Sequence, residues 1–579
     1  MFGLLLLIHV GLAQLGAAST VYDTSSLQAR SYNTTVSWGS CGSDYERFQC
    51  ANISVPLDYN DASDTRTATI FVNRIQGTNT THKLGSIFIN PGGPGVSGSI
   101  FNFVLGQNLS AVLKGQYDII GFDPRGVRQS KPYVSCFDSL LEEEMFVRNT
   151  SNFRLNLPSN ITSDVAENLK YQLINVTSET AALSAQCFER LGNTVKLFGT
   201  EAVVHDIDIL SKLIDGDDAP INYWGWSYGT VIGQYMLAIL PPERLGRIII
   251  DGIVDVVGWS DYPIQPVNVT TDMGHVLEGF ATSCASSGNA CAISNLTAPG
   301  ILSMIDNTLD SLYRSPAFVT DLGADYGQVP INAGNLRYII FEAMYDILSW
   351  PLLGEILSEA FSGNYTLIAQ ATATGLNSAD ASQPDDSGYA TSMIYCNDAK
   401  PYDQSHPPLT IDQLTQNVIE AVTQNSPVLG EMLYQLGLCQ FWGNIMPSKS
   451  RYNGTFDLAP GTLRDPILVL SQTFDPVAAL ASAVRTQERL GDNARLVQQV
   501  GGLGHCTISQ VSFCTLPIVQ SYMLYGELPD GDYTACQVDQ LPFTPFNESA
   551  AANRTEGLDL ESREAWIALS ASLSTLEAL

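Results

Sequence analysis

Basic side chains are scarce in this chain of 579 residues. Lysine and arginine together number 28 against 59 aspartates and glutamates, so the formal net charge is -31 and the isoelectric point is about 4.3. A polyanion of this size repels nucleic acid and anionic membrane surfaces, and we therefore expect neither as a partner. Solubility in an acidic medium is the simpler explanation of the charge.

Long apolar runs and the usual metal-binding spacings are also missing. No stretch reaches the roughly 18 consecutive apolar residues that a membrane-spanning helix needs, so we expect no membrane anchor. No cysteine or histidine falls in a C-x-x-C or H-x-x-x-H pattern, which argues against a metal site. With 45% hydrophobic and 15% charged residues, the composition is that of a folded protein with a core.

The first residues are typical of a secretory signal. An apolar run over residues 1–13 is followed by the small residues Gly16, Ala17 and Ala18, and we predict cleavage after Ala18. The run is too short to span a bilayer, although the usual basic start is missing because the first basic residue is Arg30. The rest of the chain is therefore expected to be secreted.

Asparagine glycosylation sequons are dense, which suits a glycosylated extracellular surface. They lie at Asn33, Asn52, Asn79, Asn108, Asn149, Asn160, Asn175, Asn268, Asn295, Asn364, Asn453, Asn547 and Asn553.

The eleven cysteines suggest disulfides in an oxidising compartment, with one thiol left over. Several are closely spaced, namely Cys41 and Cys50, Cys284 and Cys291, and Cys506 and Cys514. Two more, Cys136 and Cys187, lie in the polar segment 131–198. We expect that segment to be an irregular surface insertion that a disulfide can pin.

A strand, a G-x-S-x-G turn and a helix follow one another at residues 221–240. Apolar and aromatic residues lead into Gly225, and residues 230–240 carry apolar side chains at helical spacing. This is the context of a nucleophile elbow centred on Ser227. Glycines at 225 and 229 are expected because side chains beside so tight a turn would clash. At the helix N-terminus, the dipole and free N–H groups favour a developing oxyanion.

Strands and helices alternate around this turn. Strands are predicted at residues 50–59, 66–75, 84–90, 117–123, 247–252, 465–472 and 494–500. Together with helical segments such as 200–214, they predict an α/β fold with a mainly parallel sheet and helices on both faces. Residues 259–443 instead have helical periodicity and look like a cap inserted between strands.

This organisation divides the chain into five parts. We expect a signal peptide at 1–18, the first part of the core at 19–258 and the helical cap at 259–443. The second part of the core follows at 444–545, and an acidic tail that ends in a short helix occupies 546–579.

Two further polar residues follow late strands. Asp475 comes after the strand at 465–472, and His505 lies in a glycine-rich loop after the strand at 494–500. Asp475 alone could initiate a turn before Pro476, and His505 alone could be a surface histidine. The order Ser227, Asp475, His505 is nevertheless that of α/β-hydrolases, and open α/β sheets place their sites at the carboxyl ends of strands. His505 would take the proton of Ser227, and Asp475 would fix the histidine tautomer.

The loop Pro91–Gly95 follows another buried strand. Glycine and proline this dense set a rigid loop whose N–H groups can point into one cavity. A hydrolase with this chain order carries its second oxyanion donor there, although a plain tight turn is an equal alternative.

Several linked motifs together resemble one family. They are Asn90–Gly95, Gly121–Gly126, Gly225–Thr230, Asp251–Asp255, Cys396–Asp398 and Gly504–His505. Over roughly residues 48–545 the chain resembles the secreted tripeptidyl-aminopeptidase-like α/β-hydrolases, serine peptidases related to the prolyl aminopeptidases, with a TAP-like C-terminal region. One departure is Pro91, where the prolyl aminopeptidases carry histidine.

The resemblance implies a site and an activity. It implies the triad Ser227, Asp475 and His505, an oxyanion hole from the N–H groups of Gly93 and Tyr228, and an exopeptidase that removes short peptides from free N-termini. It also implies a disulfide between Cys514 and Cys536, which would leave Cys506 as the odd thiol.

An aminopeptidase must meet the ammonium of its substrate with carboxylate. The cap offers Glu278, Glu342, Asp346, Glu355, Glu359 and Asp398. Most such residues belong to solvated helix faces. Asp398 is the first candidate because it lies within a motif.

Three functions compete. The leading one is a secreted serine exopeptidase acting on peptides. The alternative is an esterase or lactonase of the same fold acting on a small ester substrate, since one fold hosts many chemistries. The third, a degenerate hydrolase fold used for binding, is disfavoured by the intact triad. No cofactor is expected, because nucleophile, base and orienting acid are all protein groups.

Overall fold

A ten-stranded sheet runs through the centre of the described chain. In spatial order its strands are β1 (Gly39–Ser40), β2 (Phe48–Pro56), β3 (Thr67–Ile75), β5 (Asp118–Phe122), β4 (Ser86–Asn90), β6 (Ile221–Trp226), β7 (Leu245–Asp251), β10 (Ile467–Phe474), β11 (Ala494–Leu503) and β12 (Tyr533–Gln537). Neighbours from β5 to β12 are parallel, whereas β1, β2 and β3 form an antiparallel edge. The prediction of a mainly parallel sheet is confirmed.

The computed structural model describes residues 36–150, 154–320, 322, 328–377, 387–443, 451–544 and 558–576. The expected signal peptide and the sequons at Asn33, Asn547 and Asn553 lie outside these ranges. Among the helices within them, none has both the length and the apolar character needed to cross a bilayer.

Helices cover both faces of the sheet, as predicted. The helices α1 (Gly98–Val112), α15 (Thr515–Tyr525) and α17 (Leu560–Leu576) share one apolar cluster with strand residues such as Ile87 and Ile89. The helices α4 (Thr200–Asp215), α5 (Tyr228–Ile239) and α14 (Leu480–Leu490) share the other cluster with Phe88. Successive residues of a strand point to opposite faces, so one buried strand feeds both cores.

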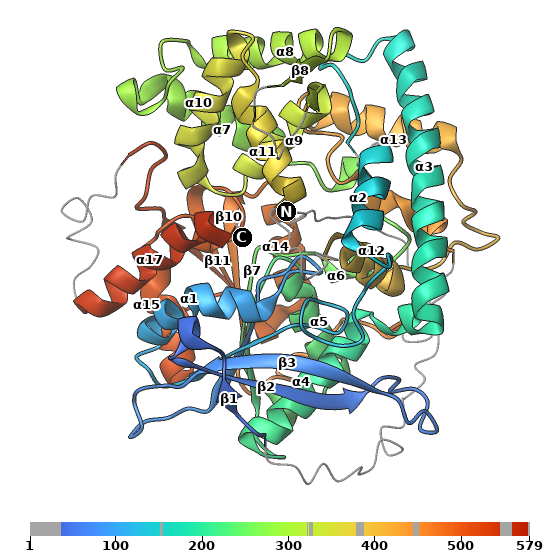
Figure 1. Ribbon diagram of the computed structural model, residues 1–579. Helices are drawn as coiled ribbons and strands as arrows, with labels where there is room; N and C mark the ends of the chain where they lie inside the picture. The colour runs from blue at the N-terminus through green and yellow to red at the C-terminus, as the bar shows by residue number, and fades with distance from the viewer. Residues whose placement is uncertain are drawn as a thin grey trace.

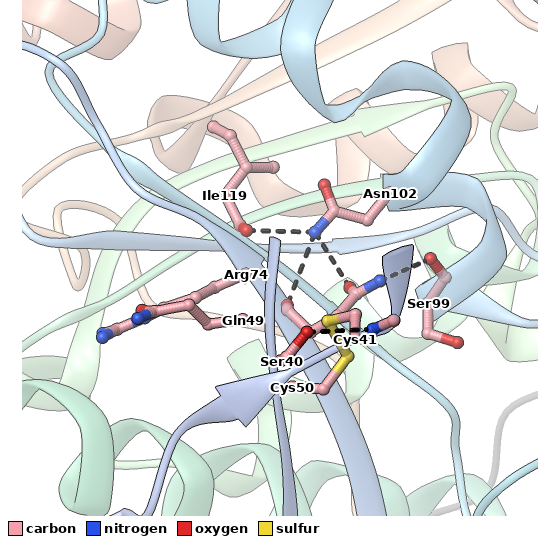
Figure 2. Close-up of a disulfide and its surroundings, with 10 residues drawn as sticks. Ser40, Cys41, Gln49, Cys50, Arg74, Ser99, Asn102 and Ile119 are labelled. Atoms are coloured by element: carbon pink, nitrogen blue, oxygen red, sulfur yellow. Dashed lines mark hydrogen bonds between the residues drawn. A yellow bond between two sulfur atoms is a disulfide. The ribbon is translucent and has the colours of Figure 1, made fainter. Parts of the chain in front are cut away.

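The start of α1 is fastened to the antiparallel edge of the sheet. The Nδ2 atom of Asn102 donates to the carbonyl of Ile119 (3.1 Å) and to Oδ1 of Asn73 (2.9 Å), whose own amide reaches the carbonyl of Ser99 (2.8 Å). Figure 2 shows this network beside the disulfide of Cys41 and Cys50. Because α1 follows the Pro91–Gly95 loop, the network also limits where that loop can lie.

Beyond the carboxyl ends of the strands, the chain between β7 and β10 is mostly helical. Its described elements include α6 (Val256–Trp259), α7 (Met273–Ser286), α8 (Ala298–Arg314), α9 (Ala333–Ala343), α10 (Trp350–Phe361), α11 (Thr366–Asn377), α12 (Ser387–Asp398) and α13 (Ile411–Gln424). Figure 1 shows most of these helices gathered at one end of the molecule. A short hairpin of β8 (Ala317–Val319) and β9 (Val329–Ile331) was not predicted.

The composition of segment 131–198 had suggested an irregular surface insertion, but the segment is largely helical. It forms α2 (Leu140–Asn149) and the 29-residue helix α3 (Ser163–Leu191). Helix α3 buries a stripe of side chains at Val165, Leu169, Leu173, Val176, Thr180, Leu183 and Cys187. The exposed sequon at Asn175 and the polar residues on the outer face of α3 hid this three-to-four-residue spacing. The disulfide of Cys136 and Cys187 does pin the segment.

Ten of the eleven cysteines pair. The bonds join Cys41 with Cys50, Cys136 with Cys187, Cys284 with Cys291, Cys396 with Cys439, and Cys514 with Cys536. The close spacing of Cys506 and Cys514 therefore does not make a pair, and the pairing implied by the family resemblance is the one present. Cys506 is a buried free thiol.

The C-terminal segment ends in a helix, as predicted, and that helix belongs to the core. Trp566 and Leu569 of α17 are buried in the cluster that includes α1. Figure 1 shows α17 lying beside α1. The ring of Trp566 stacks on Trp224 of β6, with centroids 6.5 Å apart. The segment therefore covers the strand that leads into the elbow.

Candidate active site

The elbow has the predicted strand, turn and helix. Ser227 lies between β6 and α5 with φ 55° and ψ -126°, a conformation that residues other than glycine rarely adopt. Added Cβ atoms would lie 2.3 Å from the carbonyl oxygen of Gly229 at position 225, and 2.6 Å from that of Asn90 at position 229. The expectation that both flanking positions require glycine is confirmed.

His505 and Asp475 are in direct contact. Nδ1 of His505 lies 2.9 Å and 3.0 Å from the two carboxylate oxygens of Asp475. Oδ1 of Asp475 also accepts from the N–H groups of Val477 (3.0 Å) and Ala478 (2.8 Å), and Oδ2 accepts from that of Cys506 (2.9 Å). Every oxygen of this buried carboxylate therefore has partners, and the imidazole is held by one nitrogen.

The other nitrogen of His505 is left for a reacting partner. Nε2 is buried and has no hydrogen-bond partner among the described residues. The ring packs edge-on against Tyr345 at a centroid distance of 5.0 Å, and the backbone N–H of His505 donates to the Tyr345 carbonyl (2.8 Å). These contacts fix the ring from the cap side.

The elbow and the histidine loop meet at one carbonyl. The backbone N–H of Ser227 donates to the carbonyl oxygen of Asp251 (3.0 Å), and the thiol of Cys506 donates to the same oxygen (3.4 Å). The residue that precedes Cys506 is His505. The three predicted triad residues, far apart in sequence, are thus brought to one edge of the sheet.

The Pro91–Gly95 loop presses against the elbow. Gly92, at φ 109°, is so close that a Cβ atom there would lie 2.7 Å from Cβ of Ser227 and 3.0 Å from the backbone nitrogen of Tyr228. Gly93 follows at φ 100°, where glycine is again favoured. Tyr228 opens α5, so its N–H has no partner within the helix. The donor roles of Gly93 and Tyr228 stay predictions.

One group of side chains could approach a metal ion. Ligand atoms of Asp475, His505 and Cys506 lie within 4.8 Å of one another in the described chain. The oxygens of Asp475 are occupied by four donors, and burial raises the pKa of the Cys506 thiol. A metal would need the thiolate, so this donor set fits a hydrogen-bonded pair better than a metal centre.

The carboxylate of Asp398 is enclosed by hydrogen-bond donors of the protein. The residue is buried, and its carboxylate accepts from the backbone N–H of Thr200 (2.7 Å), the hydroxyl of Thr200 and Nε1 of Trp259 (2.8 Å). Burial raises its pKa to about 6. These contacts join α12 to the N-terminus of α4 and favour a structural role. The predicted contact with a substrate's amino terminus stays untested.

Two other cap carboxylates lie close in sequence to Tyr345. Asp346 is 1% exposed; its Oδ1 accepts from the N–H of Leu348 (2.9 Å), and its Oδ2 is buried with no partner among the described residues. Oε1 of Glu342 is likewise buried and unpartnered. Burial raises the pKa of Asp346 to about 7 and that of Glu342 to about 8. Sequence periodicity gave no signal that distinguished these acids from solvated ones.

Comparison with protein families matches two parts of the chain. Residues 85–282 match the alpha/beta hydrolase fold family, and residues 426–536 match the family described as TAP-like protein. The first match includes the elbow, and the second includes Asp475 and His505. The chain is a TAP-like α/β-hydrolase.

Curated relatives of this TAP-like hydrolase are similar over most of their length. Serine protease Hip1 of Mycobacterium tuberculosis (strain H37Rv) is 24% identical over 90% of this chain and 95% of its own. Tripeptidyl aminopeptidase of Streptomyces lividans is 25% identical over 87% of both chains. Carboxylesterase B of Mycobacterium tuberculosis (strain CDC 1551) is 25% identical over 85% of this chain and 88% of its own. The TAP-like hydrolase is thus a serine hydrolase.

Proposed function

We propose that this protein is a secreted serine exopeptidase that releases short peptides from free N-termini through an acyl-enzyme on Ser227. The observation that carries the proposal is the state of His505. Its Nδ1 is held by Asp475, while its buried Nε2 has no hydrogen-bond partner among the described residues. Relatives named as a serine protease and a tripeptidyl aminopeptidase support peptides as the substrate class.

The acylation step uses these groups as follows. His505 Nε2 accepts the proton of the Ser227 hydroxyl as the oxygen attacks the scissile carbonyl carbon. The negative charge that develops on the carbonyl oxygen is met by the N–H groups of Gly93 and Tyr228. The C–N bond then breaks, the leaving amine takes the proton from His505, and the N-terminal fragment remains as an ester on Ser227.

Deacylation repeats the sequence with water. Water gives a proton to His505 and attacks the ester carbonyl; the proton then passes to the Ser227 oxygen as the acid fragment leaves. The carboxylate of Asp475 stabilises the imidazolium in both halves. Its four donors support this role, because hydrogen bonds that are already in place hold the carboxylate against the imidazole without reorganisation.

We assign the substrate's ammonium to Asp346. This carboxyl follows Tyr345, the cap residue that touches His505, and within the described part of the chain one of its buried oxygens has no partner. Native proteins rarely leave a buried polar atom in that state unless a ligand or water completes it. A substrate ammonium would supply the missing charge and hydrogen bond. Asp346 therefore replaces Asp398 as our first choice.

Glu342 is a second, less open candidate for the same ammonium. Arg154 and Tyr338 both lie near its carboxyl, and the guanidinium carbon of Arg154 is 4.2 Å from the centre of the Tyr338 ring. The positive charge of Arg154 partly offsets the demand for a cation at Glu342. Among the described residues, no cation offsets the effect of burial on the pKa of Asp346 in this way. An ammonium therefore gains more at Asp346.

Secretion and glycosylation are supported by the disulfides and by the sequons. Five disulfides suit an oxidising compartment. Wherever the burial of a sequon asparagine is described, that residue is exposed or half-buried, as at Asn52, Asn175, Asn268 and Asn364. An attached glycan needs such a position.

The proposal is tested with matched substrates. A tripeptide p-nitroanilide with a free amine, its N-acetylated twin and a p-nitrophenyl ester are compared on the full-length secreted protein. We expect the p-nitroanilide with a free amine to be cleaved fastest. Ser227→Ala should abolish both turnover and fluorophosphonate labelling. Mass spectrometry of a digested peptide mixture gives the length of the released fragments. Equal rates on free and acetylated peptides would defeat the exopeptidase.

The alternative remains an esterase or lactonase of the same site. The relative named Carboxylesterase B favours it. It predicts fast turnover of the p-nitrophenyl ester, no preference for a free amine, and no effect of Asp346 on substrate choice.

A further inference from the structure

The last residue of β7, Asp251, takes no part in the reaction described above. Asp251 is fully buried and lies between the two halves of the site. It is paired with Trp226 across the β6–β7 ladder and with Leu470 across the β7–β10 ladder. Trp226 directly precedes Ser227. Asp251 is therefore the residue of β7 that lies beside the start of the elbow.

The backbone of Asp251 contacts the nucleophile segment. Its carbonyl oxygen accepts the N–H of Ser227 (3.0 Å). Ser227 has a strained positive φ, and a strained residue keeps its conformation only when its surroundings hold it there. The Asp251 carbonyl is one such restraint.

The side chain of the same residue contacts the histidine segment. Oδ1 of Asp251 accepts the backbone N–H of Thr507 (2.7 Å), and Oδ2 accepts its hydroxyl (2.7 Å). Thr507 is two residues beyond His505. The carboxylate therefore holds the loop from which the imidazole projects, and the Cys506 thiol adds a contact to the Asp251 carbonyl (3.4 Å).

We propose that Asp251 is a positioning residue that aligns the nucleophile Ser227 with His505. The inference rests on the proposed roles of Ser227 and His505. Ser227 and His505 come from different parts of the chain, and their proton transfer depends on alignment to a fraction of an ångström. One residue that binds both segments removes the freedom between them.

An amide at this position can keep the tie. Asparagine Oδ1 can accept the Thr507 N–H, and its Nδ2 can donate to the Thr507 hydroxyl. Burial already raises the pKa of Asp251 to about 7, with Asp475 and His505 as the nearby titrating groups and Cys506 adjacent. The neutral form is therefore tolerated, and Asp251→Asn serves as the conservative variant.

The experiment compares Asp251→Ala, Asp251→Asn and Thr507→Val by kcat, KM and the rate of fluorophosphonate labelling. We expect Asp251→Ala to lower kcat and the labelling rate by roughly 10-fold to 100-fold with KM nearly unchanged, because misalignment affects chemistry more than binding. Thr507→Val, which loses only the hydroxyl, should lose less. Asp251→Asn should restore both rates to within about threefold of the wild type.

Controls separate misalignment from unfolding. Asp118→Ala removes another buried strand carboxylate, which accepts the N–H of Gly77 (2.8 Å). Asp118 is the first residue of β5, away from the carboxyl ends of the strands where the site lies, so this variant should leave kcat unchanged in folded protein. A folded Asp251→Ala protein with wild-type kcat and labelling overturns the proposal. If that variant does not fold, Thr507→Val decides: a loss of kcat without a change in KM supports the tie, and unchanged rates overturn it. Failure of the wild type itself to label points to the proposed function instead.

Discussion

Asp475 in the core and Asp346 in the cap are both buried carboxylates on segments that contact His505, and they differ in how fully their oxygens are used. Asp475 accepts hydrogen bonds from His505 and from three backbone N–H groups. Asp346 accepts one, from Leu348, and keeps a buried oxygen without a partner among the described residues. Core and cap thus carry buried carboxylates in different states on segments that contact the histidine.

The difference teaches where preorganisation is complete and where a ligand must complete it. A carboxylate that holds its partners before substrate arrives can stabilise charge without reorganisation. A buried carboxyl that lacks a cation prefers its neutral form, as the raised pKa of Asp346 indicates. It becomes a good carboxylate only when a cation binds. We therefore expect core substitutions to affect every substrate and cap substitutions to affect one class.

The largest expected effect is that of Asp475→Asn. It should lower kcat by about 10,000-fold on free-amine peptides, acetylated peptides and esters alike, because the histidine loses its tautomer and its counter-charge. Steady-state kinetics on all three substrates measure this. Asp118→Asn is the matched control for a buried carboxylate away from the site. A loss confined to one substrate class would break the distinction between core and cap.

The second effect is selective. Asp346→Asn should lower kcat/KM for the free-amine peptide by about 30-fold, which corresponds to about 2 kcal/mol for one charge-assisted hydrogen bond. The acetylated twin and the ester should change less than about threefold, since neither carries an ammonium. Glu342→Gln, measured in parallel, locates the ammonium if Asp346→Asn has no selective effect.

The core half of this comparison could be predicted from the sequence, and the cap half could not. Ser227, Asp475 and His505 each follow a recognisable strand, and parallel strands bring their carboxyl ends to one edge. Gly225 and Gly229 indicate the turn in the sequence, because a side chain at either position would clash with the backbone. Local patterns and one topological rule therefore suffice for these residues.

Asp346 carries no such signal. Asp251 ends a predicted strand and opens one of the family motifs, yet neither pattern shows that its carboxylate holds Thr507. Whether a cap acid faces solvent or a dry interior depends on packing between helices far apart in sequence. Asp398 lies in a motif, yet its oxygens hold Thr200 and Trp259. The role of Trp566 was hidden for the same reason, because a tail without strand alternation gives no hint that it covers β6. Contacts between distant segments are the part that periodicity does not encode.

The third effect is a pH dependence. Burial raises the pKa of Asp346 to about 7, so the carboxylate that attracts an ammonium is present above pH 7 and is lost as the pH falls below it. The ratio of kcat/KM for free to acetylated peptide should rise about fivefold from pH 6 to pH 7, and fall above about pH 8 as the substrate amine loses its proton. The ratio cancels any pH dependence of the catalytic step that both substrates share. In Asp346→Asn the rise should vanish; a rise that persists there assigns it to another carboxyl.

The smallest effect on activity is expected for Asp398→Asn. This variant tests whether a cap carboxylate whose oxygens are all hydrogen-bonded behaves like Asp475 or like Asp346. Its oxygens already serve Thr200 and Trp259, so the preference for a free amine should change less than about twofold. Its contribution is to stability, because the amide satisfies those donors less well; we expect a loss of about 1–2 kcal/mol in the free energy of unfolding. Denaturant unfolding and the ratio of rates on the two peptides measure the two quantities. A selective loss of about tenfold or more on the free-amine peptide would return the ammonium site to Asp398 and make saturation of the carboxylate a poor guide to substrate contact.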